Sequence, residues 1–174
     1  MYSTLIVFQR DMDIIALFLG QLLNEFLNQF LKRTIKQSRP HGARASGSGM
    51  PSAHSQFIAF FAAYVVAYTL KRLNGYRQVE KILTIPAAIV LAALVCYSRV
   101  RLGYHTVEQV LVGAIIGSGM GLAWFAFIDK VSVWLFPLIV NSALGRFFYL
   151  RDISHVPDLI VFQHQLCHQS AKRQ

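Results

Sequence analysis

The chain has 174 residues, enough for one domain, and 55% of them are hydrophobic, with a mean hydropathy of +0.44. This composition excludes an ordinary soluble domain and indicates a membrane protein. The net charge of +9 does not indicate a nucleic-acid-binding protein, because apolar stretches separate the Lys and Arg residues.

Four apolar segments approach the ~20 residues that a helix needs to cross a bilayer. They are residues 14–31, 57–70, 82–97 and 107–128. Residues 39–51 are rich in Gly, Ser, Ala and Arg and predict a loop, and a basic loop is predicted around Asn74-Gly75. Residues 131–140 are apolar but few and contain Pro137, so we expect an interfacial or re-entrant segment there.

The sequence therefore predicts an all-α, polytopic membrane helical bundle with about four spans. We expect residues 1–140 to form a single membrane-embedded domain, and residues 141–174 to form a cytoplasmic C-terminal tail. Glu25 lies within the first span and should face the bundle and bond to a neighbouring helix. Gly113, Gly117 and Gly121 recur every four residues, which predicts a close helix-packing face.

Three short polar motifs lie at the ends of the predicted spans. They are Lys32-x6-Arg39-Pro40, Pro51-Ser52-Ala53-His54 and Ser98-Arg99-x5-His105. Successive spans alternate in direction. One membrane face therefore carries the end of the first span, the start of the second, the end of the third and the start of the fourth. We therefore expect the three motifs to meet there.

The distribution of basic residues predicts the orientation of that face. Ten of the 17 Lys and Arg residues would lie on the opposite face and seven on the motif face. Since several of the seven belong to the three motifs and are expected to have a chemical role, the remaining excess favours a cytoplasmic opposite face. The motif face is then expected to point toward the lumen or exterior.

The motif residues suit the chemistry of phosphoryl transfer. Arg39 and Arg99 can each present a planar fork of donors to phosphate oxygens, and Lys32 adds a compact charge. Ser52 and Ala53 precede an apolar helix, whose first N–H groups favour an anion, and Ser52 is expected to cap the helix or contact phosphate. These cations can neutralise a phosphate themselves, so we expect neither a metal nor another cofactor.

The motifs resemble those of the type 2 phosphatidic acid phosphatase superfamily, Lys-x6-Arg-Pro, Pro-Ser-x-His and Ser-Arg-x5-His-x3-Asp. All but the last residue match. The resemblance implies that His105 is the nucleophile, forming a phosphohistidine, and that His54 is the general acid. Gln109 replaces the family's Asp, and we expect it to accept the imidazole N–H and fix the tautomer without adding negative charge.

Within the superfamily, residues 49–57, 97–106 and 147–152 resemble the dolichyldiphosphatases. These enzymes of the endoplasmic reticulum remove a phosphate from dolichyl diphosphate, so that the lipid carrier returns to N-glycosylation. The resemblance implies a multi-pass hydrolase of that membrane with a lumenal site and a polyisoprenyl diphosphate substrate. Such enzymes usually have an additional apolar span upstream of the first span predicted here.

Two alternatives to this assignment remain, of which the first uses the same residues and the same mechanism. One is a phosphatase for another lipid phosphate, such as phosphatidate. The other is a non-catalytic lipid-binding relative, suggested by Gln109. Phosphate release from a panel of lipids would separate them. His164, Cys167 and His168 have a spacing that could bind metal, but in a polar terminus we expect no such site.

Overall fold

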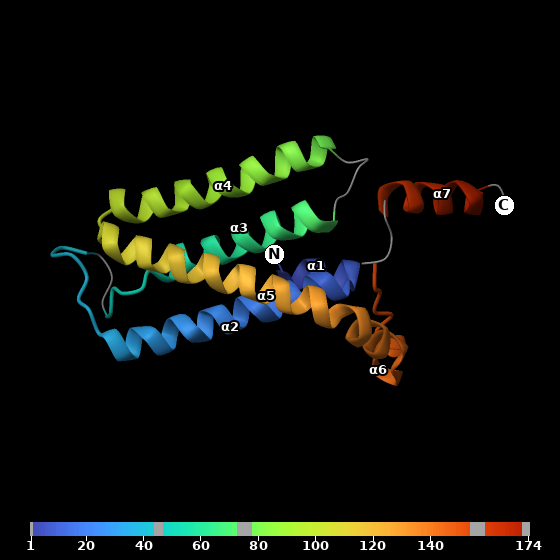
Figure 1. Cartoon of the computed structure of the whole chain (residues 1–174), viewed down its shortest axis with the longest axis horizontal. Coiled ribbons are helices and arrows are strands. Elements are labelled where there is room, and N and C mark those ends of the chain that lie inside the picture. Colours follow the sequence, from blue (N-terminus) through green and yellow to red (C-terminus); the bar gives the residue numbers. More distant parts are fainter. Residues whose placement is uncertain (1, 44–46, 73–77, 154–158, 172–174) are drawn as a thin grey trace. The chain divides into compact units, whose positions relative to one another are not determined.

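The computed structural model describes residues 2–43, 47–72, 78–153 and 159–171, and these ranges contain helices and no named strand. The predicted loop around Asn74-Gly75 lies outside them. The helices are α1 (Tyr2–Gln9), α2 (Met12–Ile35), α3 (Ala53–Arg72), α4 (Gln78–Arg101), α5 (Val107–Asn141), α6 (Ala143–Phe147) and α7 (Leu159–Ala171) (Figure 1). The predicted all-α fold is confirmed.

Helices α2, α3, α4 and α5 are long and apolar enough to cross a membrane, which confirms the four predicted spans. The segment 131–140 differs from its prediction, because it continues α5 without a break to Asn141 and contains Pro137 inside the helix. A proline removes one backbone hydrogen bond, and helices in membranes tolerate that loss. With 35 residues, α5 is ~52 Å long, more than the ~30 Å of a bilayer core.

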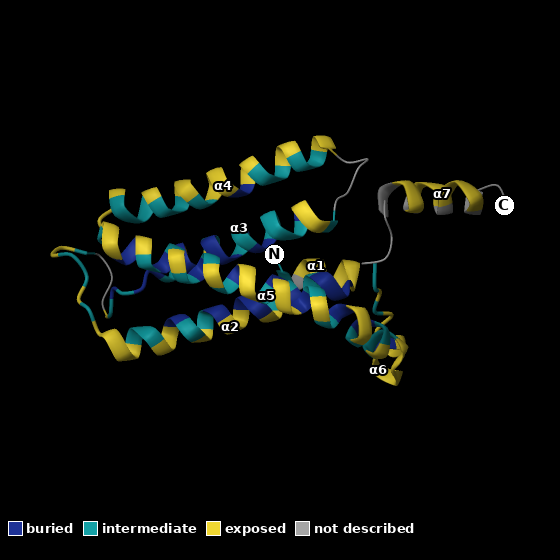
Figure 2. Ribbon diagram, viewed as in Figure 1, coloured by how far each residue is buried: buried dark blue, intermediate teal, exposed yellow. Residues whose placement is uncertain are grey.

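The chain divides into two compact units, one of residues Ala16–Val131 and one of Met1–Ile15 with Ser132–Gln174. The unit Ala16–Val131 contains α3, α4 and most of α2 and α5. The predicted division into residues 1–140 and 141–174 stays a prediction. In Figure 2 the buried residues of this unit lie mainly along α2, α3 and α5, whereas α4 is largely exposed. Exposed apolar side chains are what a lipid-facing helix requires.

Polar side chains join α2 to α3 inside the bundle. Gln56 Nε2 donates to the Asn24 carbonyl at 3.0 Å and to Asn24 Oδ1 at 2.9 Å, and Asn28 Nδ2 donates to Gln56 Oε1 at 2.7 Å. All three side chains are fully buried. In a membrane such bonds fix how two helices pack, because water cannot replace them. They set the register of the end of α2 against the start of α3.

The charge of Glu25 acts on His54 of α3, but the hydrogen bond of its carboxylate lies within α2. Its carboxylate accepts a hydrogen bond from Gln29 Nε2 at 2.6 Å, one turn along the same helix. Neighbouring residues of a helix point about 100° apart, so the face that carries Asn24 and Asn28 meets α3 and Glu25 lies beside it. The hydrogen bonds between α2 and α3 on this face therefore belong to the two asparagines.

The three glycines of α5 pack against the backbone of α3, as predicted. A Cβ added at Gly113 would lie 2.7 Å from the Ser52 carbonyl oxygen, and one at Gly121 would lie 2.6 Å from the Phe60 carbonyl oxygen. Gly117 faces the Gln56 carbonyl in the same way. Any side chain here would push the helices apart, so small residues permit this close approach.

These contacts bring four helix ends to one end of the bundle. Figure 1 shows the C-terminal ends of α2 and α4 and the N-terminal ends of α3 and α5 at the same end of the bundle. The backbone N–H of Ser52, just before α3, donates to the Gln109 carbonyl in the first turn of α5 at 3.0 Å. The prediction that the three motifs share one face is confirmed.

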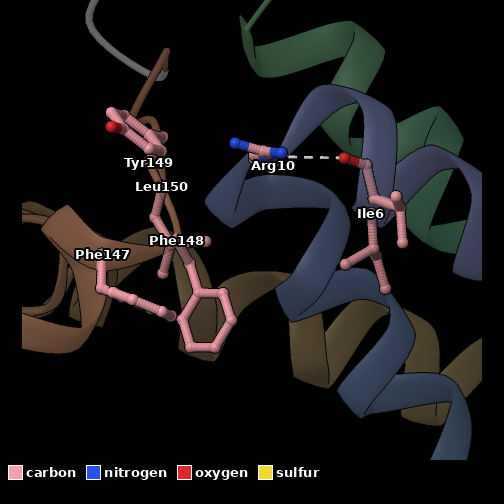
Figure 3. Close-up of a pocket in the computed structure, with 7 residues that line it drawn as sticks. Ile6, Arg10, Phe147, Phe148, Tyr149 and Leu150 are labelled. Atoms are coloured by element: carbon pink, nitrogen blue, oxygen red, sulfur yellow. Dashed lines mark hydrogen bonds between the residues drawn. The ribbon is translucent and has the colours of Figure 1, made fainter.

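The other unit joins residues from near both ends of the chain. The Arg151 N–H donates to the Arg10 carbonyl at 2.8 Å, and the Met12 N–H donates to the Arg151 carbonyl at 3.0 Å. Figure 3 shows a pocket of about 390 Å³ in this unit, where the Arg10 guanidinium lies 5.8 Å from the centre of the Tyr149 ring. None of the predicted site residues lines this pocket.

Candidate functional site

The spacing between Arg99 and His105 follows from the way α4 ends. Gly103 has φ = 71°, a left-handed conformation that glycine adopts without strain and that commonly terminates helices. The chain then turns back, and the N–H groups of Tyr104 and His105 both donate to the Arg99 carbonyl, at 3.1 Å and 3.3 Å. The turn therefore holds His105 beside the residue that supplies a predicted phosphate ligand.

Helix α5 begins with a capping box that the sequence analysis missed. Thr106 Oγ1 accepts a hydrogen bond from the Gln109 N–H at 3.3 Å, and Gln109 Oε1 accepts one from the Thr106 N–H at 3.3 Å. The signal was present in the sequence as Thr-x-x-Gln directly before an apolar segment. The capping box aims the amide oxygen of Gln109 toward the residue before Thr106, which is His105.

His105 is the most enclosed of the predicted catalytic residues, with 4% of its surface exposed. Its Nδ1 lies 3.2 Å from Gln109 Oε1, so a proton on Nδ1 is donated to the amide and Nε2 keeps its lone pair. Burial lowers the pKa of His105, and the charge of Arg39 also lowers it, while the hydrogen bonds to Gln109 and to the backbone of Gly49 act in the opposite direction. The neutral ring, which is the form that can attack phosphorus, is therefore favoured.

Tyr104 orders both predicted arginines, a role that the sequence analysis did not assign to it. Arg39 Nη1 donates to the Tyr104 carbonyl at 3.4 Å, and the Arg99 guanidinium lies 5.2 Å from the centre of the Tyr104 ring. Within the described residues, Arg39 Nε is buried and has no hydrogen-bond partner. A buried guanidinium donor without a partner costs free energy, which an anionic ligand would relieve.

Lys32 and His54 lie within electrostatic reach of the same group. His54 is exposed in the first turn of α3 and interacts with the charges of three cations, Arg99, Lys32 and Arg39, and with the opposite charge of Glu25. Lys32, in the last turn of α2, interacts with Arg39 and also with His105. The structure thus brings together the five ionisable residues that the sequence predicts for phosphoryl transfer, while their individual roles stay predictions.

Ser52 and Ala53 lie where α3 begins. Ser52 is fully buried, its N–H is bonded to Gln109, and its hydroxyl accepts a hydrogen bond from Ser55 Oγ at 3.1 Å. Ala53 is the first residue of α3. The position of Ser52 suits the capping role. Direct contact of either residue with phosphate stays a prediction.

Among the described residues no group of three or more His, Cys, Asp and Glu side chains is arranged to hold a metal ion. His164 and His168 lie on α7 with ring centres 5.9 Å apart. The expectation that the protein uses neither a metal nor another cofactor stays a prediction.

Comparison with known proteins agrees with this arrangement. Residues 13–132 match the PAP2 superfamily. The chain is 42% identical to Dolichyldiphosphatase 1 of Dictyostelium discoideum, over 92% of this chain and 72% of that protein. It is 36% identical to Dolichyldiphosphatase 1 of Homo sapiens, over 98% of this chain and 76% of that protein.

A solved structure has the same fold. It is a transmembrane PAP2-type phosphatidylglycerolphosphate phosphatase from Bacillus subtilis, with a TM-score of 0.64 and 28% identity. The match covers 74% of this chain and 65% of that one. With its four spans, the protein is a multi-pass membrane protein whose relatives are lipid phosphatases. The chain belongs to the PAP2 superfamily and, within it, to the dolichyldiphosphatase family.

Proposed function

We propose that the protein hydrolyses dolichyl diphosphate to dolichyl phosphate and phosphate. The observation that carries the proposal is the meeting of two histidines and three cations at one end of the bundle, where a buried Arg39 donor lacks a partner among the described residues. The names of the relatives support this substrate over other lipid phosphates.

The first step transfers the terminal phosphoryl group to His105. Nε2 attacks the terminal phosphorus, and the bond between that phosphorus and the bridging oxygen breaks. His54 donates its proton to the bridging oxygen, so that dolichyl phosphate leaves. The exposure of His54 suits this role, because the leaving group must reach it from solvent or from the headgroup layer.

The second step regenerates the enzyme. His54, now neutral, takes a proton from a water molecule as the oxygen attacks phosphorus, and the bond between phosphorus and Nε2 breaks to release phosphate. Throughout both steps Lys32, Arg39 and Arg99 offset the charge on the phosphoryl oxygens. Gln109 supports the cationic ring through one hydrogen bond and no charge.

The proposed reaction returns a lipid carrier to N-glycosylation in the endoplasmic reticulum, with the site facing the lumen. The excess of basic residues on the opposite face supports this orientation. Reporter tags appended after Gln174 and inserted at Gly47 should then be found in the cytoplasm and in the lumen, respectively. The opposite result in sealed microsomes would reverse the orientation.

The function is tested by phosphate release from purified protein in mixed micelles. We expect dolichyl diphosphate to be hydrolysed faster than phosphatidate and phosphatidylglycerol phosphate, with His105→Ala inactive on all three. Faster hydrolysis of another lipid would move the assignment to that lipid. Binding of dolichyl diphosphate without turnover would identify a non-catalytic relative. Activity should persist in chelator, and a loss restored by magnesium would contradict the metal-free mechanism.

A further inference from the structure

We infer that Gln37, in the segment between α2 and α3, is a positioning residue that holds the Gln109 amide in the orientation that sets the tautomer of His105. Gln37 lies between Lys32 and Arg39 but belongs to none of the motif positions. The inference rests on the proposed function, in which His105 attacks phosphorus through Nε2.

The side-chain amide of Gln109 has a partner for every hydrogen bond that it can make. Its Nε2 donates to Gln37 Oε1 at 3.1 Å and to the Ser38 carbonyl at 2.8 Å. Its Oε1 accepts from the Thr106 N–H at 3.3 Å and faces His105 Nδ1 at 3.2 Å. A primary amide has two N–H donors and two acceptor lone pairs, so all are used. With 1% of Gln109 exposed, water has little access to compete.

The two acceptors on the nitrogen side select the orientation of this amide. If the amide were reversed, its oxygen would face the Ser38 carbonyl and Gln37 Oε1, and its nitrogen would face the Thr106 N–H. With the Gln37 amide oriented as it is, all three contacts would repel. The reversed amide would also donate to His105 Nδ1, which would then need the lone pair while Nε2 carried the proton. The atom proposed to attack phosphorus would be blocked.

The backbone of Gln37 is itself held in place by the segment that it belongs to. Its carbonyl accepts hydrogen bonds from the Gly49 N–H at 2.7 Å and from Ser48 Oγ at 3.4 Å. A Cβ at Gly49 would lie 2.7 Å from Gln109 Nε2, so a glycine allows Gly49 to approach the amide closely. Of the two acceptors, Ser38 uses its backbone, and Gln37 is the one that a substitution can remove.

The substitution Gln37→Met removes this acceptor at nearly constant length. We expect kcat to fall about tenfold, the lower end of the loss that follows removal of a hydrogen-bond partner from a metal-bound histidine, because Gln37 acts on His105 through Gln109. KM should stay unchanged, because Gln37 is not proposed to touch substrate. Gln29→Met is the matched control, since Gln29 is exposed on α2 and bonds to Glu25. Equal kcat values for the two variants would overturn the inference.

A double-mutant cycle separates positioning from a general effect on the loop. In a Gln109→Leu background there is no amide to orient, so Gln37→Met should cost no further kcat. A further loss as large as in the wild-type background would show that Gln37 acts through another residue and would overturn the inference. The cycle can use whichever lipid phosphate the protein hydrolyses fastest.

A spectroscopic measurement tests the inference without turnover. In solid-state ¹⁵N NMR of histidine-labelled protein in bilayers, His105→Ala identifies the His105 signals among the six histidines. Above the histidine pKa, the wild type should show the tautomer protonated at Nδ1, and Gln37→Met should show a mixture. An unchanged tautomer would overturn the inference whatever the substrate. A changed tautomer in a protein that hydrolyses no lipid would instead refute the proposed function.

Discussion

The polar contacts between α2 and α3 predict that Gln56→Leu destabilises the bundle and lowers activity. Leucine removes the three side-chain hydrogen bonds that Gln56 makes with Asn24 and Asn28, and leaves Asn24 Oδ1 without that donor. At ~0.6 kcal/mol for each bond inside a membrane protein, the free energy of unfolding should fall by about 2 kcal/mol. The contact from Asn24 Nδ2 to the Gln56 carbonyl at 3.4 Å would remain.

The assay is unfolding of the purified protein in mixed micelles with increasing denaturing detergent, compared with Gln29→Leu. Gln29 is exposed and bonds within its own helix, so its variant should change stability by less than ~0.5 kcal/mol. Because Gln56 sets the register between the helix that carries Lys32 and the helix that carries His54, kcat should fall as well. Equal stability of the two variants would refute the claim that these bonds hold α2 against α3.

Three further predictions concern individual ionisable groups. His54→Ala should lower kcat on a lipid diphosphate about 100-fold or more. The loss of kcat should be smaller on p-nitrophenyl phosphate, because its leaving group needs no proton, and an equal loss on both substrates would exclude the general-acid role. Gln109→Asp should raise the pKa of His105 and move the acidic limb of the pH–rate profile to higher pH. If the limb stays at the same pH, residue 109 does not act on His105. Burial and Asp13 raise the pKa of Asp11 to about 7. A raised pKa means that its contribution to stability is present at low pH and lost as the pH rises through about 7. Asp11→Asn should therefore gain up to about 4 kcal/mol relative to wild type above that pH and little at about pH 4, and an equal difference at both would contradict this.

The parts of this molecule that depend on local sequence were predictable. Span length and hydropathy give α2 to α5, and alternation of the spans places the three motifs at one end. The glycine repeat of α5 also indicates its packing face, since a four-residue period of small residues has few other uses in a membrane helix. The continuation of α5 through Pro137 was not predicted, because a proline in a soluble helix is a strong reason to end it.

The parts that were missed depend on partners far apart in the sequence. Asn24 and Asn28 are polar residues one turn apart in an apolar span, which signals a buried partner but does not identify Gln56. Glu25, their neighbour, carried the stronger signal as a charge and proved to bond within its own helix. Tyr104 orders two arginines through its carbonyl and its ring, and a carbonyl has no signature in sequence.

The glutamine that departs from the superfamily signature has a structural reason in this chain. An aspartate at position 109 would be shorter and would have no N–H, so it could not reach and donate to Gln37 Oε1 and the Ser38 carbonyl. Both acceptors would then face a carboxylate, an arrangement that repels. Glutamine satisfies these acceptors with one end and holds His105 with the other. The segment before α3 and Gln109 are therefore matched to each other. Because this match requires an amide at position 109, that position provides no negative charge beside the His105 imidazole.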